Sequence, residues 1–440
     1  MDMKTLLIHR VRHGEPSCSS AFFSVFHGLV AAVLLLTAPL AQAQLRYDIE
    51  YPAIGYGKEL PQDAFSRMMA AQEAGELQLE KGSEAAGYLE SVLDALDIDP
   101  ASQILVFSKT SQKQRLISTE QPRALYFNDE VYIGYVPGSR TLEVAAMDPA
   151  QGQVFFDFEQ EPERAKAPFT QETSRCLRCH DSYSLSGGGV PRFLLQSVLA
   201  NADGNIVSHE ISEVTTTATP ISRRWGGLFV TGTHGDQPHM GNLIVNDAAS
   251  LQAIDTTTWG NRTSLEEFTS LEDYPRQTSD IVALLVLEHQ IEVQNALTRL
   301  NFETRQRLAA GETLEAAQLD ELTTPLLDSL FMANEVALGA PIAGTSGYAE
   351  NFQARGPRSN EDRSLRQLDL QEHTFHYPLS YLIYSDAIDG LAEPVRTHLF
   401  GRIKAVLAHA PGAPDYPRLT EALRADISAI LRDTKPEVLE

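Results

Sequence analysis

PRALYFNDEVYIGYV, residues 122–136, indicates a β-sheet more clearly than any other stretch of this sequence. Residues 124–136 are rich in Val, Ile, Tyr and Phe, the side chains that a pleated, half-buried strand favours. The neighbouring segments 103–108 and 141–158 have the same composition, and turn residues separate the three. The first half of the chain is therefore expected to contain several short strands.

Two further strands are expected downstream, at 192–199 and 225–231, and Asp203-Gly204-Asn205 forms a turn after the first of them. Helical patterns lie on either side of this β-rich part. Residues 62–97 carry helix-forming Ala, Glu, Leu and Met, and from residue 279 apolar side chains recur at helical spacing. Ser279 is placed to cap the start of that helix and Gly311 its end. Three more helices are expected, at 315–338, 393–409 and 417–433. The pattern predicts an α+β fold with a helical C-terminal half.

The composition sets limits on function. The chain has 440 residues, of which 43% are hydrophobic, so it has enough apolar material for a core and is neither disordered nor fibrous. It carries 35 Lys and Arg against 59 Asp and Glu, a net charge of -24. A chain this acidic is repelled by nucleic-acid phosphates and by anionic lipid headgroups, so neither is an expected partner.

The N-terminus has the pattern of a signal peptide. Lys4, Arg10 and Arg12 precede an apolar stretch, residues 21–40, and Ala41-Gln42-Ala43 follows it as a small-x-small cleavage site. We expect residues 1–43 to be removed on export, which gives a periplasmic or secreted protein with no membrane insertion after cleavage. The alternative is an uncleaved membrane anchor, because the apolar run approaches spanning length.

The remaining cysteines form a motif. Cys18 falls within the expected signal peptide, which leaves Cys176 and Cys179, a pair too close for an ordinary loop-closing disulfide. Cys176-Leu177-Arg178-Cys179-His180 reads C-x-x-C-H, the attachment signature of c-type haem. Two thiols add to the haem vinyl groups, and the histidine that follows binds the iron. The sequence thus predicts one covalent haem c, with its iron on His180. The alternatives are a redox C-x-x-C pair or half of a zinc site.

At these five residues the chain resembles monohaem c-type cytochromes. The rest of it resembles a family of exported bacterial haem proteins of about this length. That resemblance is carried by FSKTSQ (107–112), PRALYFNDEVYIGYV (122–136), RRWGGLFVTGTHG (223–235) and GTSGYAENFQARGP (344–357). It implies a common fold built around one haem and specifies no reaction.

The second axial position of the iron has three candidate ligands in one loop. Thr231 to Asn242 read TGTHGDQPHMGN, which places two histidines and a methionine among glycines and a proline. Glycines let a backbone approach a flat macrocycle closely. His239 and Met240 rank equally as ligands, and His234 ranks third. The alternative is a polar loop that contains one hydrogen-bonded histidine.

Other residues offer weaker candidates for the haem surroundings. His289 shares a helix face with apolar residues, so it is either a hydrogen-bonded core histidine or an acid/base group on the distal side of the haem. Arg223 and Arg224 can pair with haem propionates or with ordinary carboxylates. His373 and His376 have a spacing compatible with a second metal ion, which nearby Pro378 weakens.

These features predict an exported, monohaem c-type cytochrome-like protein that transfers electrons to or from a redox partner protein. The alternative is a peroxidase-like haem enzyme with an open distal site that acts on a small oxidant. A haem-based gas sensor is a third class, for which the sequence offers no output module. The expected organisation has four parts: 1–43 the signal peptide, 44–165 an N-terminal helix with a β-rich region, 166–250 the haem attachment and distal-ligand region, and 270–440 a helical region.

Overall fold

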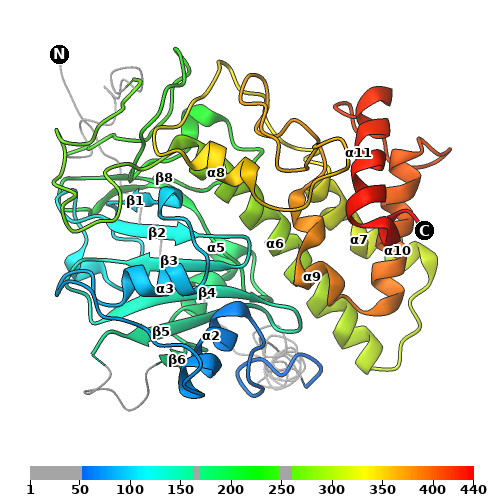
Figure 1. Ribbon diagram of the computed structural model, residues 1–440, viewed down its shortest axis with the longest axis horizontal. Coiled ribbons are helices and arrows are strands. Elements are labelled where there is room, and N and C mark those ends of the chain that lie inside the picture. Colours follow the sequence, from blue (N-terminus) through cyan, green and yellow to red (C-terminus); the bar gives the residue numbers. More distant parts are fainter. Residues whose placement is uncertain (1–51, 162–168, 247–259) are drawn as a thin grey trace, which may run out of the picture. The chain divides into compact units, whose positions relative to one another are not determined.

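The computed structural model describes residues 52–161, 169–246 and 260–440 (Figure 1). All of them belong to one unit, Ile49–Glu440. The expected signal peptide lies outside the described residues, and so do the expected boundaries at 43, 165 and 250. The signal peptide and these boundaries stay predictions.

A seven-stranded antiparallel sheet occupies the first half of this unit. Its order is β6-β5-β4-β3-β2-β1-β9, so successive strands pair with each other from β1 to β6 and β9 returns to lie beside β1. The strands are β1 (Ile104–Val106), β2 (Arg123–Phe127), β3 (Val131–Tyr135), β4 (Thr141–Asp148), β5 (Gly152–Glu159), β6 (Phe169–Gln171) and β9 (Leu228–Phe229). The strands expected at 103–108, 124–136 and 141–158 are confirmed. The strand expected at 225–231 shrinks to two residues, and it starts only at Leu228 because Trp225 and Gly227 adopt positive φ angles of 70° and 78°, which a strand does not accommodate.

Two connections in this sheet, β2 to β3 and β4 to β5, are tight turns that polar side chains close. Asn128 accepts hydrogen bonds from the backbone N–H groups of Glu130 and Val131, 3.0 and 2.9 Å away, in the turn between β2 and β3. Asp148 accepts from Ala150 and Gln151 between β4 and β5, at 2.8 and 2.6 Å. Asn and Asp favour turns for this reason.

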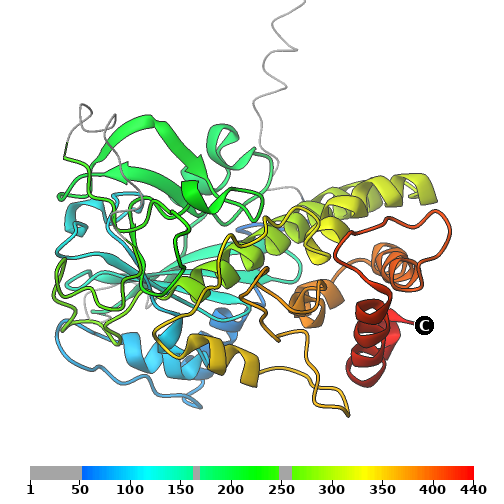
Figure 2. The same ribbon diagram turned by 90° about the horizontal axis from the view of Figure 1, so that it is seen from above.

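The two faces of the sheet have different neighbours (Figure 2). Helices α2 (Ala64–Glu73) and α3 (Leu89–Ala95) cover one face, where Phe65 of α2 lies 5.0 Å from the ring of Phe156. Alternate residues point to the other face, so Phe155 and Tyr132 meet Phe193 there, with ring centroids 6.1 and 4.4 Å apart. A second, two-stranded sheet lies on that side, made of β7 (Gln196–Ala200) and β8 (Ile206–Val214).

The longest helix, α6 (Ile281–Ala309), spans 29 residues and joins the sheet to the C-terminal helices (Figure 1). Its amide side chains hold the sheet: Gln290 donates to the carbonyl oxygen of Asn128 and Gln294 to that of Asp129, both at 2.7 Å. The helix begins with Asp280 as its N-cap, whose carboxylate accepts from Val282 N–H, and the expected cap at Ser279 is therefore wrong. Both residue types can cap a helix, but the Ser279 hydroxyl is already engaged, since it bonds β1 and β9.

Shorter helices complete the C-terminal half. They are α7 (Ala316–Leu330), α8 (Tyr348–Ala354), α9 (Asp386–Asp389), α10 (Glu393–Leu407) and α11 (Glu421–Thr434). The sheet together with these helices confirms the α+β class. Within residues 52–161, 169–246 and 260–440, no helix has both the length and the apolar character needed to cross a membrane.

Candidate functional site

The C-x-x-C-H motif folds into a single helical turn. Cys176 precedes α4 (Leu177–His180), and its carbonyl oxygen accepts hydrogen bonds from Cys179 N–H at 3.2 Å and His180 N–H at 3.0 Å. Cys176 is half-buried and Cys179 is exposed, and both are free thiols. A second one-turn helix follows at once, α5 (Tyr183–Ser186), where the sequence shows no helical pattern.

The surroundings of Cys176 keep its thiol protonated. Burial raises the pKa of Cys176 and, together with the carboxylates of Glu143 and Asp157, brings it to about 12. A redox-active C-x-x-C pair needs the opposite, a lowered thiol pKa that supplies a thiolate nucleophile. The environment thus disfavours the redox interpretation of the pair.

His180 is held in one orientation by the backbone. Its Nδ1 lies 2.6 Å from the carbonyl oxygen of Arg192, and the N–H of Arg192 donates to the carbonyl oxygen of His180 at 2.8 Å. Since a carbonyl only accepts, Nδ1 carries the proton and Nε2 presents its lone pair. Burial lowers the pKa of His180, which keeps the ring neutral. A neutral imidazole whose other nitrogen is fixed by a carbonyl is the usual form of a metal-binding histidine.

The segment that carries Arg192 is fixed to α6. Arg299 of α6 donates to the carbonyl oxygen of Gly188 at 2.9 Å. Asn295 of α6 bonds both backbone groups of Phe193: its Oδ1 accepts from the N–H at 2.9 Å and its Nδ2 donates to the carbonyl at 3.0 Å. The long helix therefore determines where the carbonyl of Arg192, and hence the imidazole of His180, is placed.

The sheet supports the other side of the imidazole. The ring of His180 lies 4.5 Å from the ring of Phe155 on β5. Asp181, the next residue, is buried and accepts hydrogen bonds from Gly189 and Val190 N–H. Burial raises the pKa of Asp181 to about 6. These contacts order the turn that follows the motif.

The loop expected to supply the second ligand is held by other contacts. His239 is buried, its Nδ1 accepts from Gly241 N–H at 2.9 Å, and its ring lies 5.3 Å from Trp225 and 4.5 Å from His234. Burial lowers the pKa of His239 to about 3. The Nδ1 of His234 lies 2.7 Å from the carbonyl oxygen of Gln237, and its buried Nε2 has no hydrogen-bond partner.

Met240 belongs to a small apolar cluster with Leu199, Leu243 and Val245. Its sulfur is 3.9 Å from the hydroxyl oxygen of Ser197 on β7. Ligation of iron by His239, Met240 or His234 stays a prediction. For His239 and Met240 it requires these contacts to be exchanged for contacts with the haem.

The C-x-x-C-H motif and the loop with the expected second ligand are attached to α6 at different positions along the helix. Trp225, beside His239, donates to Glu288 at 3.1 Å, whereas the segment beside His180 is attached at Asn295 and Arg299. Glu288 precedes Asn295 by seven residues, about 10 Å along a helix. Along α6, the attachment point of the loop that carries His239 thus lies about two helical turns from the attachment point of the segment beside His180.

The remaining candidates have structural partners. His289 is a buried core histidine whose Nε2 bonds the Ser380 hydroxyl at 2.7 Å, the commoner of its two expected roles. Arg224 forms a buried ion pair with Glu288 at 2.6 Å, and Arg223 pairs with Glu213, so both have ordinary carboxylate partners.

The second metal site gains no support from the geometry. His373 lies outside any helix, with its Nδ1 3.7 Å from Glu335, and His376 packs on Tyr377. In the part of the chain that the structure describes, no three His, Cys, Asp or Glu side chains are arranged to hold a metal ion.

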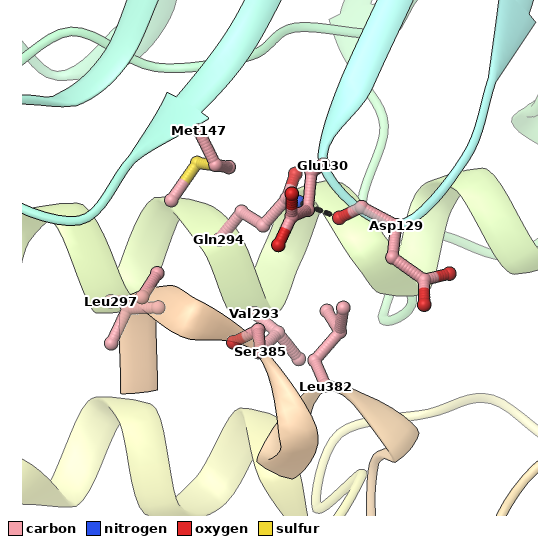
Figure 3. Close-up of a pocket in the computed structure, with 9 residues that line it drawn as sticks. Asp129, Glu130, Met147, Val293, Gln294, Leu297, Leu382 and Ser385 are labelled. Carbon is pink, nitrogen blue, oxygen red and sulfur yellow. Dashed lines mark hydrogen bonds between the residues drawn. The ribbon is translucent and has the colours of Figure 1, made fainter. Parts of the chain in front are cut away.

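Figure 3 shows a cavity between the sheet and α6, and no residue of the motif lines it. Polar Asp129, Glu130 and Gln294 line one side of it, and apolar residues such as Met147 and Leu297 line the other. Its volume of about 10 Å³ is room for a single water molecule. It is too small to hold a haem or a substrate.

The chain was compared with known proteins in three ways. No protein-family model matches it, and neither a curated protein nor a solved structure does. The geometry of the motif is therefore the basis for inferring a function.

Sequence reasoning missed the residues that support His180. The carbonyl of Arg192 is a backbone group, so no residue type reveals it. Asn295 did leave a signal, because it is an amide within the apolar pattern of α6 and such a residue needs a hydrogen-bond partner when it is buried.

Proposed function

We propose that this protein is exported, carries one covalent haem c, and transfers electrons to or from a redox partner protein. The haem is attached through Cys176 and Cys179, and His180 Nε2 binds its iron. The observation that carries the proposal is the hydrogen bond from His180 Nδ1 to the carbonyl of Arg192, 2.6 Å long. It leaves the second ring nitrogen of the motif's histidine to a metal.

The residues present fit this group. Two free thiols and an imidazole lie on one helical turn, and the raised pKa of Cys176 protects its thiol from premature reaction. When bound, haem supplies one-electron chemistry at its iron. The chain's own contribution is rigidity: α6 holds Arg192 in place through Phe193, and Phe155 supports the imidazole ring. A ligand held in this way moves little when the charge on the metal changes.

The test is covalent attachment. The full chain is expressed in a host that matures c-type cytochromes, denatured, and extracted with acidified acetone. We expect colour to stay on the wild-type protein and to be lost from a Cys176→Ala, Cys179→Ala double variant. The His180→Ala variant should keep covalent haem but show a changed absorption spectrum and midpoint potential. Haem that extracts freely from correctly exported wild type contradicts the proposal.

A haem enzyme with an open distal site is the second candidate, and one observation favours it. His239 and Met240 are engaged by Gly241 and Ser197, so the predicted distal ligands have other partners. Cyanide separates the two functions. A six-coordinate electron carrier binds it poorly, whereas an enzyme with an open site binds it readily and gives a high-spin ferric spectrum before the addition. Rapid cyanide binding by wild type would replace the electron-transfer proposal with the enzyme.

A further inference from the structure

One face of the main sheet is covered incompletely beside the C-x-x-C-H motif. On β4 the residues Leu142, Val144 and Ala146 are buried toward α2 and α3, whereas Glu143 and Ala145 on the opposite face are only half-buried. On β2 the same alternation runs from Arg123 to Tyr126, and on β3 the half-buried Tyr132 lies between buried neighbours. The half-buried apolar side chains of this face are Leu125, Tyr132 and Ala145.

Strand register brings these side chains together. Tyr132 of β3 pairs with Ala145 of β4, and Ala145 pairs with Phe155 of β5. Leu125 of β2 pairs with Gly134, which is next but one to Tyr132 on β3. Residues that pair across strands lie on the same face, so Leu125, Tyr132 and Ala145 form one surface, which we call the sheet patch.

The sheet patch is continuous with the attachment motif. Phe155, which pairs with Ala145, is the residue on which the His180 ring lies, 4.5 Å between centroids. Cys176 packs on the same core as the patch residues. The charge of Glu143, next but one to Ala145 on the same strand, acts on both Cys176 and His180. A macrocycle attached at Cys176 and Cys179 starts from the border of this surface.

A charged pair borders the sheet patch. Arg123 of β2 reaches across Gly134 to Glu143 of β4, and its Nε lies 2.7 Å from a carboxylate oxygen. Gly134 leaves room for this pair, because a Cβ on residue 134 would lie 2.6 Å from Nη2 of the guanidinium and would push it aside. Both facing atoms, Arg123 Nε and Glu143 Oε2, are buried and lack a well-oriented hydrogen bond. The two groups are close enough to form an ion pair, but neither of these atoms has a hydrogen-bond partner of good geometry. Arg123 therefore keeps N–H groups that can donate to another acceptor.

We propose that the haem lies against the sheet patch, with one face over Leu125 and Ala145, beside the ring pair Tyr132–Phe193, and with Arg123 beside a propionate. This inference rests on the proposed function, because it places the haem that the motif attaches. Burial of apolar surface and a guanidinium for the propionate are what such a group needs in a chain with a net charge of -24.

The first test reads the position of the haem without changing the protein. In ferrous, low-spin holoprotein the porphyrin ring current moves the methyl resonances of residues that lie over its face. We expect the methyl signals of Leu125 and Ala145 to be shifted far upfield from their positions in the apoprotein. The methyl of Ala413, a half-exposed alanine between α10 and α11, should not move. Unshifted Leu125 and Ala145 signals in a protein that carries covalent haem overturn the placement and leave the proposed function standing.

The second test uses charge. Ferric haem carries one more positive charge than ferrous haem, so a nearby cation favours the ferrous form. We expect Arg123→Gln to lower the midpoint potential and Glu143→Gln to raise it. The exposed pair Arg358 and Asp362 supplies matched controls, Arg358→Gln and Asp362→Asn, which should leave the potential unchanged. Equal potentials in all four variants contradict the placement, and so does a shift in Arg223→Gln in place of Arg123→Gln. If wild type acquires no covalent haem, both the placement and the proposed function are wrong.

Discussion

His180 and His289 are each held by one hydrogen bond, but through different ring nitrogens. In His180 the bonded atom is Nδ1, which leaves Nε2 to a metal. In His289 the bonded atom is Nε2, whose partner is the Ser380 hydroxyl, and Phe375 and Tyr381 surround the ring. Residue type alone does not distinguish the two histidines, whereas the hydrogen bonds show that Nε2 is available to a metal in His180 and occupied in His289.

The buried state of His289 has a consequence for stability. Burial, together with the charge of Arg418, lowers its pKa to about 3. An exposed histidine in the unfolded chain has a pKa of about 6.5. Between these pH values the unfolded chain binds a proton that the folded chain refuses, so this histidine's contribution to stability is lost as the pH falls through the window.

We therefore expect the free energy of unfolding of wild type to fall more steeply below pH 6.5 than that of His289→Gln. The difference in slope approaches about 1.4 kcal/mol per pH unit. Urea unfolding of apoprotein between pH 7 and pH 4.5 measures it. Parallel pH dependences of the two proteins would show that His289 titrates alike in the folded and unfolded chains.

Among the elements, α6 links the sheet to the motif through Asn295. This one side chain bonds both backbone groups of Phe193 and accepts from Gln153 of β5 at 3.0 Å. Replacement by leucine leaves these buried partners unpaired, at about 1 to 3 kcal/mol each. We expect Asn295→Leu to destabilise the apoprotein by about 2 to 4 kcal/mol.

The same variant should disturb His180 in the holoprotein, because the carbonyl of Arg192 is no longer held. A mixture of spin states in the absorption spectrum is the expected sign. Gln306→Ala, a partly exposed position on the same helix, serves as the control and should change stability by less than about 0.5 kcal/mol. A stable Asn295→Leu protein with a wild-type spectrum would show that α6 does not position His180.

The turn between β4 and β5 makes a second close contact with α6. Gly152 has a φ of 69°, and a Cβ at this position would lie 2.4 Å from Cγ2 of Thr298. We expect Gly152→Ala to cost about 2 kcal/mol or more, partly from backbone strain and partly from the clash. Thr298→Ala removes the clashing methyl, so the cost should fall to about 1 kcal/mol in that background. A double-mutant cycle by urea unfolding measures the coupling, and purely additive effects would show that the contact carries no strain.

Elements with a regular apolar pattern could be predicted from the sequence, and the others could not. Strands β1 to β5 and α6 follow composition and periodicity, because each buries a continuous face, whereas the three-residue β6 was not predicted. Strand β8 was missed, since its middle residues are exposed and polar, and only pairing with β7 makes it a strand. The C-x-x-C-H motif, on which the proposed haem attachment rests, can be recognised in the sequence because its five residues are consecutive. Its support by Arg192 and α6 depends on contacts distant in sequence.

The net charge of the whole protein is expected to affect how fast charged reagents react with the haem. A net charge of -24 produces a negative potential around the molecule, although Arg123 and Arg175 balance carboxylates near the motif. Charged reagents that reach the haem must cross this potential, which accelerates cations and slows anions. We therefore expect the reduced holoprotein to be oxidised faster by hexaammineruthenium(III) than the driving force alone predicts, and more slowly by ferricyanide.

Salt distinguishes this steering from a local effect of the site. Raising the ionic strength from about 10 mM to 150 mM shortens the Debye length from about 30 Å to about 8 Å. Oxidation by the cationic reagent should slow several-fold over this range, and oxidation by ferricyanide should accelerate. Stopped-flow absorbance of the haem measures both rates. The same field favours a redox partner with a basic docking surface, because complementary potentials raise the rate of encounter. If ferricyanide is instead the faster oxidant, and if its reaction slows as salt is added, the cations around the motif outweigh the acidic remainder of the chain.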